Sequence, residues 1–168
     1  MQERETDSSE VRLADRNDAP EISRVLREAF EEFKPLYTPA GFTATTPTSE
    51  EILIRLTEGP VWIASQKGVI VGTAAAVNKG DSLYVRGMAV LPAARGQRIG
   101  ELLLGRIERF ALDQRCKRLF LSTTPFLHRA IRLYEYFGFR RTYEGPTELF
   151  GTPLFTMTKE LEVAAPKK

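Results

Sequence analysis

The sequence predicts an α/β protein of the α+β type, in which helices cover both faces of a mixed, mostly antiparallel sheet of about seven strands. Two observations support this fold class. Three strand-like runs between residues 61 and 90 are separated only by turn signals, which is typical of an antiparallel meander. After residue 90, strand-like runs alternate with runs of helical periodicity, and this order is typical of a sheet with helices on its faces.

The N-terminal part begins with a short strand at residues 11–14, after which Asn17-Asp18-Ala19-Pro20 provides cap-type residues and an early proline for a first helix. Apolar residues recur at helical spacing as far as Phe33, so one face of this helix is expected to be buried. Residues 34–47 are rich in Pro, Gly and Thr and predict a loop. A short helix at 49–56 with an acidic first turn follows.

The middle of the chain predicts three strands, at residues 61–66, 69–78 and 83–90. Lys67-Gly68 is a tight hairpin signal between the first two strands, and Gly80-Asp81 turns the chain into the third. Gly87 within the third strand indicates either a β-bulge or a simple relief of crowding.

The remainder predicts a helix at 99–115, a strand at 119–122, a helix at 127–137 and two strands at 139–143 and 154–161. Ligands of such sheets tend to bind where neighbouring strands part at their carboxyl ends.

One such end carries an anion-binding signal, Arg95-Gly96-Gln97-Arg98-Ile99-Gly100, between a strand and a helix. The first amides of a helix lack intrahelical partners and carry a partial positive charge, which favours a phosphate. Glycines allow a close approach of the phosphate, and the arginines add charge. Neither a Walker loop nor a dinucleotide fingerprint is present, because the required residues and glycine spacing are missing.

This loop, together with Val90-Leu91-Pro92 before it and the later Leu133-Tyr134-Glu135 and Gly138-Phe139 signature, resembles the GNAT superfamily of acyl-CoA-dependent N-acyltransferases. The resemblance covers roughly residues 61–139. It implies that the fourth and fifth strands splay apart and that the pantetheine arm of coenzyme A enters between them. It further implies acetyl-CoA as the cosubstrate. The expected cofactor-binding residues are Met88, Ala89, Val90, Arg95, Gly96, Gln97, Arg98, Ile99, Gly100 and Glu101.

Tyr134 is the candidate catalytic acid. A phenol with a pKa of about 10 stays protonated at neutral pH and can give a proton to the departing thiolate. A tyrosine on an apolar helical stripe is more often a core residue, but the surrounding motif favours the catalytic role. We therefore expect Tyr134→Phe to lower turnover while the affinity for acetyl-CoA is kept.

Three positions depart from the family pattern. Arg98 replaces the first glycine of the loop, Leu127 stands where many members have an asparagine, and Tyr84 stands where a strand-four carboxylate is common. The general base is therefore left open between a first-helix glutamate (Glu31 or Glu32), His128 and a chain of water molecules.

Composition excludes several other functions. The 24 Lys and Arg against 22 Asp and Glu give a formal charge of +2, so neither nucleic acid nor a membrane surface is an expected partner. Cys116 is the only cysteine and is read as a packing residue. No metal-ligand spacing is present, so no metal is expected. A cytoplasmic protein is predicted, with one domain at residues 11–163 and disordered tails at 1–10 and 164–168.

The expected activity is direct transfer of an acetyl group from acetyl-CoA to a primary amine of a small molecule or peptide. The alternative is a catalytically weak acyl-CoA sensor or interaction domain of the same fold.

Arg129 and Arg132 could meet the 3′-phosphate of coenzyme A or form a solvated face. The identity of the amine and the formation of a homodimer stay open. A partly aromatic acceptor wall is suggested by Phe33, Tyr37, Phe42 and Phe150.

Overall fold

The structure is a computed structural model, and it describes residues 9–162. Its main sheet has seven strands in the order β1-β2-β3-β4-β5-β9-β6. Every neighbouring pair is antiparallel except β4 and β5, which run parallel. The strands of this sheet are β1 (Glu10–Leu13), β2 (Val61–Gln66), β3 (Val69–Lys79), β4 (Ser82–Val90), β5 (Arg118–Thr123), β6 (Arg140–Thr142) and β9 (Phe155–Glu160). The predicted mixed, mostly antiparallel sheet is confirmed.

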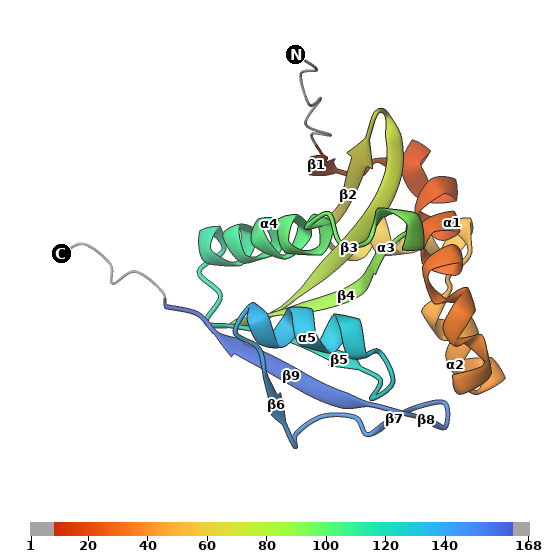
Figure 1. The fold of residues 1–168 in the computed structure, drawn as a ribbon. Coiled ribbons are helices and arrows are strands. Elements are labelled where there is room, and N and C mark those ends of the chain that lie inside the picture. Colours follow the sequence, from red (N-terminus) through yellow and green to blue (C-terminus); the bar gives the residue numbers. More distant parts are fainter. Residues whose placement is uncertain (1–8, 163–168) are drawn as a thin grey trace, which may run out of the picture.

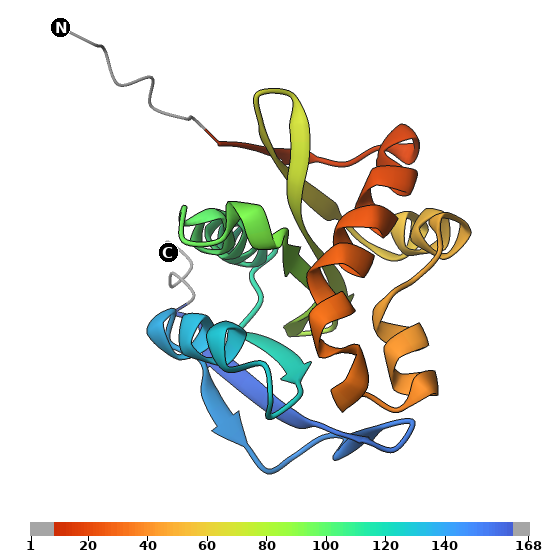
Figure 2. The same ribbon diagram turned by 45° about the vertical axis from the view of Figure 1, so that its right-hand side comes forward.

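Helices cover both faces of the sheet, as predicted (Figure 1). One face is covered by α1 (Ala19–Phe30) and α3 (Ser49–Glu58), whose apolar residues pack with Val61, Ile63 and Ala75. The opposite face is covered by α4 (Ile99–Asp113) over the first strands and α5 (His128–Tyr136) over β5 and β9. The view in Figure 2 shows α1 and α3 together on their side of the sheet.

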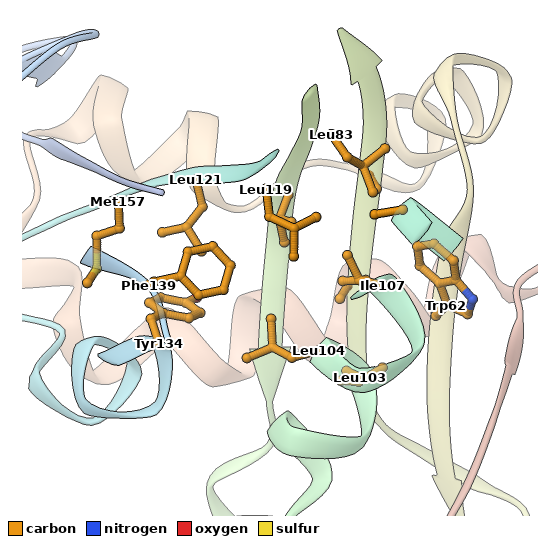
Figure 3. Close-up of a cluster of buried hydrophobic side chains, with 14 of the residues drawn as sticks. Trp62, Leu83, Leu103, Leu104, Ile107, Leu119, Leu121, Tyr134, Phe139 and Met157 are labelled. Carbon is orange, nitrogen blue, oxygen red and sulfur yellow. The ribbon is translucent and has the colours of Figure 1, made fainter. Parts of the chain in front are cut away.

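The larger core lies beneath α4 and α5. Figure 3 shows Leu103, Leu104 and Ile107 of α4 gathered against side chains of β4 and β5, among them Leu83 and Leu119. Leu83, Leu119 and the three α4 residues are all fully buried. Burying a side chain of this size stabilises the fold by about 2 kcal/mol, so this cluster fixes α4 on the sheet.

Strands β4 and β5 separate after three paired positions, the last of which joins Tyr84 to Phe120. Beyond that pair β4 continues to Val90 and β5 continues to Thr123 with no partner between them. The predicted splay between the fourth and fifth strands is therefore present. Helix α4 follows the end of β4 and α5 follows the end of β5, so both helices begin at the open end of the splay.

The segment predicted as a loop at residues 34–47 is mostly helical, and that prediction is wrong. A 3-10 helix, η2 (Glu31–Leu36), continues α1, and α2 (Pro39–Thr45) follows. Thr38 caps α2 by accepting a hydrogen bond from the Gly41 amide, and Pro39 occupies the first turn, where a missing N–H costs nothing. The proline and threonine content that suggested a loop instead marks a helix start.

Smaller differences concern the ends of the domain. Glu10, placed in the N-terminal tail by the sequence, pairs with Ser65 in the sheet. A two-residue hairpin, β7 (Glu148–Leu149) with β8 (Thr152–Pro153), lies between β6 and β9. Of the predicted tails, residues 1–8 and 164–168 lie outside the described residues. None of the helices within residues 9–162 is long and apolar enough to cross a membrane.

Candidate active site

The start of α4 offers unpaired amides. Arg98 precedes the helix in the left-handed conformation, with φ of 62°, and its side chain makes no cap hydrogen bond. The Leu102 amide donates to the Arg98 carbonyl at 3.1 Å and closes the first helical turn. The amides of Ile99, Gly100 and Glu101 precede that bond and have no intrahelical acceptor. They carry the positive end of the helix dipole and form the kind of site that binds a phosphate.

The two glycines of this loop serve different purposes. Gly96 has a φ of +82° and no heavy atom within 4 Å of where a Cβ would stand, so it provides a turn and an open approach. A Cβ on Gly100 would lie 2.6 Å from Leu133 Cδ2 and 3.4 Å from Met88 Cε. Gly100 therefore allows α4 to begin close to α5 and to β4.

The polar side chains of the loop are only partly directed toward the helix start. Arg95, predicted to assist an anion, forms an ion pair with Glu32 and donates to the Ala29 carbonyl at 3.2 Å. It thereby fastens the loop to the end of α1. Gln97 accepts a hydrogen bond of 2.6 Å from Gln66. Arg98 is exposed beside the free amides.

The edge of β4 that faces the splay is irregular. Thr73 pairs with Ala89 and Ala75 with Arg86, so Gly87 and Met88 together oppose one residue of β3. With Gly87 at a φ of +59°, this is a β-bulge, one of the two readings that the sequence left open. Its consequence is that Met88 has no partner in the β3 ladder.

The three predicted strand-four residues differ in what their backbone can do. Leu91 donates to the Val71 carbonyl at 2.8 Å. Because hydrogen-bonded pairs alternate along an antiparallel ladder, Ala89 also bonds across to β3, whereas the N–H of Val90 points toward the splay. Of these three residues, Ala89 uses its N–H within the ladder and is buried in the core beneath α1, Met88 is unpaired at the bulge, and Val90 stands opposite Gly72 with its N–H on the splay side.

Tyr134 projects from α5 into the apolar cluster, where its ring lies 5.8 Å from that of Phe139 (Figure 3). Tyr134 is 7% exposed. Burial raises the pKa of the Tyr134 phenol above its ordinary value, and the nearby Tyr37 raises this pKa further. The residue therefore stays protonated throughout the neutral range, but it is a weaker acid than a free phenol.

The structure does not single out one of the candidate general bases. Glu32 is occupied by Arg95, and His128 is exposed at the start of α5. Tyr84, at the position where the family often has a carboxylate, stacks on Phe120 with ring centres 5.1 Å apart. Arg129 and Arg132 are exposed on α5, near the open end of the splay.

A hollow lies on the α1 side of the molecule. It is a cavity of about 410 Å³ whose lining includes Tyr37 and Phe42, two of the four residues expected in the acceptor wall. The Tyr37 ring contacts Phe126 edge to face at 4.9 Å, and Phe33 stacks on the same ring at 6.2 Å. Phe126, which the sequence did not single out, thus joins these aromatics. Phe150 is 67% exposed in the β7–β8 turn.

The remaining singled-out residues are structural. Trp62 and Cys116 belong to the larger core, and burial raises the pKa of the Cys116 thiol, which makes it a poor nucleophile. A search of the described residues finds no group of three or more His, Cys, Asp or Glu side chains arranged to hold a metal ion.

Comparison with known proteins places this geometry in a family. Residues 23–139 match the model of the acetyltransferase (GNAT) family. The uncharacterized N-acetyltransferase YjgM of Escherichia coli K12 is 32% identical over 129 residues, which are 73% of this chain and 76% of that protein.

Solved structures show the same fold. The PaiA N-acetyltransferase of Thermoplasma acidophilum, in complex with coenzyme A, superposes with a TM-score of 0.80 over 92% of this chain and 99% of that chain, at 16% identity. YncA of Salmonella typhimurium, a putative acetyltransferase with its cofactor acetyl-CoA, superposes with a TM-score of 0.69 at 25% identity, over 95% of this chain and 98% of that one. The chain is therefore an acyltransferase that belongs to the GNAT acetyltransferase family.

Proposed function

We propose that this protein is an N-acetyltransferase that transfers an acetyl group from acetyl-CoA directly to a primary amine of a small molecule or peptide. The observation that carries the proposal is the separation of β4 from β5 after Tyr84, directly beside the uncapped start of α4. An unpaired strand edge can hydrogen-bond an extended amide chain, and an uncapped helix start can bind a diphosphate. Acetyl-CoA carries both groups in sequence.

The residues at the start of α4 suit the diphosphate. The amides of Ile99, Gly100 and Glu101 are the donors, Gly96 leaves the approach open and Arg98 adds a positive charge. Arg95 supports the loop through Glu32 and the carbonyl of Ala29. The N–H of Val90 and the backbone of Met88, which has no partner in β3, would form hydrogen bonds with the pantetheine arm.

The reaction requires the amine nitrogen to form a bond to the thioester carbon while the carbon–sulfur bond breaks. The amine loses one proton, and the sulfur leaves as a thiolate that takes up one proton. Negative charge develops on the carbonyl oxygen in the transition state, and a fixed N–H at the β4 bulge would stabilise it by roughly 3 kcal/mol. No covalent enzyme intermediate is needed.

Tyr134 supports the departure of the thiolate. Its pKa lies above the value of about 8.5 for an ordinary thiol, so proton transfer to a solvated thiolate is unfavourable. Exclusion of water also raises the pKa of the departing sulfur, because burial disfavours every anion. The phenol therefore acts first as a neutral hydrogen-bond donor to the sulfur and gives up its proton as the carbon–sulfur bond breaks.

The test combines binding with turnover. Calorimetry with acetyl-CoA and with CoA measures cosubstrate binding, and release of free thiol is followed with a panel of amines that includes amino acids, polyamines, antibiotics and peptide N-termini. We expect binding of both nucleotides and thiol release that depends on one class of amine. Binding without amine-dependent release would instead identify an acyl-CoA sensor, and absence of binding at millimolar ligand would refute the assignment.

A further inference from the structure

Two arginines from different elements meet at the β4 bulge, on the sheet face covered by α1 and α3. Arg86 is the last β4 residue before the bulge at Gly87. Arg55, on α3, places its Nη1 atom 2.9 Å from where a Cβ on Gly87 would stand. The absence of a side chain at Gly87, whose φ of +59° favours glycine, lets that guanidinium lie close to the strand backbone.

The two guanidiniums are incompletely neutralised. Arg86 forms an ion pair with Glu58 at 3.2 Å through Nη2, whereas its buried Nε has no hydrogen-bond partner. Arg55 makes no hydrogen bond or ion pair within residues 9–162, although Glu51 and Glu58 on the same helix attract it electrostatically. A buried donor on a charged group is costly to leave unpaired, and an anion that binds there removes this cost.

The electrostatics agree with this geometry. Burial, followed by repulsion from Arg86, lowers the pKa of Arg55 below its ordinary value. The arginine remains charged, because its ordinary pKa lies far above neutrality. Two partly buried cations side by side therefore form a fork-shaped site that suits one carboxylate, which can accept two parallel hydrogen bonds from a guanidinium.

The pair also lies at the right place for an acceptor. Leu83 and Val85 of β4 pack under α4, whereas Arg86 reaches α3 on the opposite face. In the proposed reaction, an amine would approach a thioester held in the splay from this second face, on which Tyr84 stacks on Phe120. In an α-amino acid, one carbon separates the amine from the carboxylate, so a carboxylate on the two arginines leaves the amine beside the bulge.

On these grounds we infer that the acceptor is a free amino acid, whose carboxylate is held by Arg55 and Arg86 while its α-amine meets the acetyl group at the Gly87–Met88 bulge. The inference rests on the acetyl transfer proposed above and narrows its acceptor. Peptide N-termini and polyamines, which have no carboxylate next to the reacting amine, become poor substrates.

The test uses matched amines that differ only in the carboxylate. Thiol release from acetyl-CoA is compared for phenylalanine, phenylalaninamide and phenethylamine, and for lysine and cadaverine. Charge-assisted hydrogen bonds of the expected strength predict a kcat/KM that is about 10- to 100-fold higher for the amino acid of at least one matched set. Equal rates for all members of both sets, or higher rates for the amines without a carboxylate, would overturn the inference while leaving acetyl transfer intact.

Variants then locate the recognition. Arg55→Gln is expected to remove most of the preference for the amino acid over its amide, because the carboxylate contact is lost. Arg86→Lys keeps the charge and the Glu58 partner but loses the fork, and it should show an intermediate preference. Arg118→Gln is the matched control, since Arg118 pairs with Glu160 at 2.7 Å on the exposed surface. It should keep the full preference.

Folding and binding controls keep the outcomes distinct. Calorimetric acetyl-CoA affinity and thermal unfolding are measured for each variant, and Arg55→Lys replaces Arg55→Gln should the latter unfold. An unchanged amino-acid preference in folded Arg55 and Arg86 variants would refute the assignment of the carboxylate to this pair. If the wild-type protein does not bind acetyl-CoA, the proposed acetyl transfer itself is refuted.

Discussion

The two halves of β4 belong to one strand but differ in how they are paired. From Ser82 to Tyr84 the strand is paired on both sides, and its buried residue Leu83 packs beneath α4. From Val85 to Val90 it is paired on one side only, contains a bulge and faces the start of α4. The first half holds the two parts of the sheet together. The second half leaves polar backbone unpaired on the β5 side, and we propose that the pantetheine arm binds there, so mutations in the two halves should separate stability from activity.

The largest expected effect is the loss of a core side chain from the paired half. Leu83→Ala removes a fully buried leucine next to the equally buried Leu119, and it should lower the free energy of unfolding by about 3 kcal/mol. Thermal and denaturant unfolding measure this loss. Calorimetric affinity for acetyl-CoA, measured well below the transition, should stay within about twofold, because the unpaired half is unchanged.

A matched variant in the unpaired half allows the loss of stability to be compared between the two halves of β4. Val90 is only partly buried, so Val90→Ala should cost about 1 kcal/mol of stability. A destabilisation as large as that of Leu83→Ala would show that the second half of β4 also carries the fold, and the comparison would fail.

The second effect concerns Tyr134, which reaches the core from the α5 side of the splay. Tyr134→Phe should lower kcat by about 100-fold, the usual share of general acid catalysis, and keep the acetyl-CoA affinity. Stopped-flow thiol release and calorimetry measure the two quantities. Tyr136→Phe, which changes an exposed tyrosine of the same helix, is the control and should leave both unchanged. Equal turnover in wild type and Tyr134→Phe would remove Tyr134 from the mechanism.

The sequence predicted the paired half of β4 and the start of α4 well, because both depend on local signals. Strand alternation, the turn at Gly80-Asp81 and the glycine-containing loop before an apolar helix are all properties of neighbouring residues. The family resemblance also implied the splay between β4 and β5. Composition alone does not predict it.

The proposed carboxylate site could not be predicted from the sequence, because it is assembled from distant segments. Arg55 and Arg86 lie 31 positions apart and look like ordinary surface charges until the bulge brings them together. Likewise, the ion pair of Arg95 with Glu32 depends on how α1 ends. The helix at Pro39–Thr45 was missed because proline and threonine signal a helix start as readily as a loop.

A smaller effect should follow from Gly100, which sets the distance between α4 and the unpaired half of β4. In Gly100→Ala the new methyl displaces Leu133 and Met88, so the KM for acetyl-CoA should rise about tenfold. Stability should change by less than about 1 kcal/mol, because alanine favours the helix. Gly105→Ala, on the same helix with open space around it, should raise stability by about 1 kcal/mol and leave KM unchanged.

Alkaline titration tests whether the surroundings of Tyr134 are as dry as the structure indicates. Its folded pKa is raised above the unfolded value of about 10. Below pH 10 both states keep the proton and stability is independent of this group. Above pH 10 the unfolded chain loses a proton that the folded chain retains, so stability falls as pH rises, approaching about 1.4 kcal/mol per pH unit. Denaturant unfolding from pH 9 to 11 should show a shallower fall for Tyr134→Phe. Parallel curves would mean that the phenol is solvated.

The smallest effect is expected at Arg98, where backbone and charge can be separated. Glycine adopts the left-handed conformation of this position without strain but enlarges the entropy of the unfolded chain, so Arg98→Gly should change stability by less than about 1 kcal/mol. Loss of the positive charge should raise the KM for acetyl-CoA about threefold at low salt and less at high salt. Arg98→Lys keeps the charge and should retain the wild-type KM. If Arg98→Gly and Arg98→Lys weaken binding equally, the arginine acts through its planar hydrogen bonds to the ligand rather than through charge, since lysine restores only the latter.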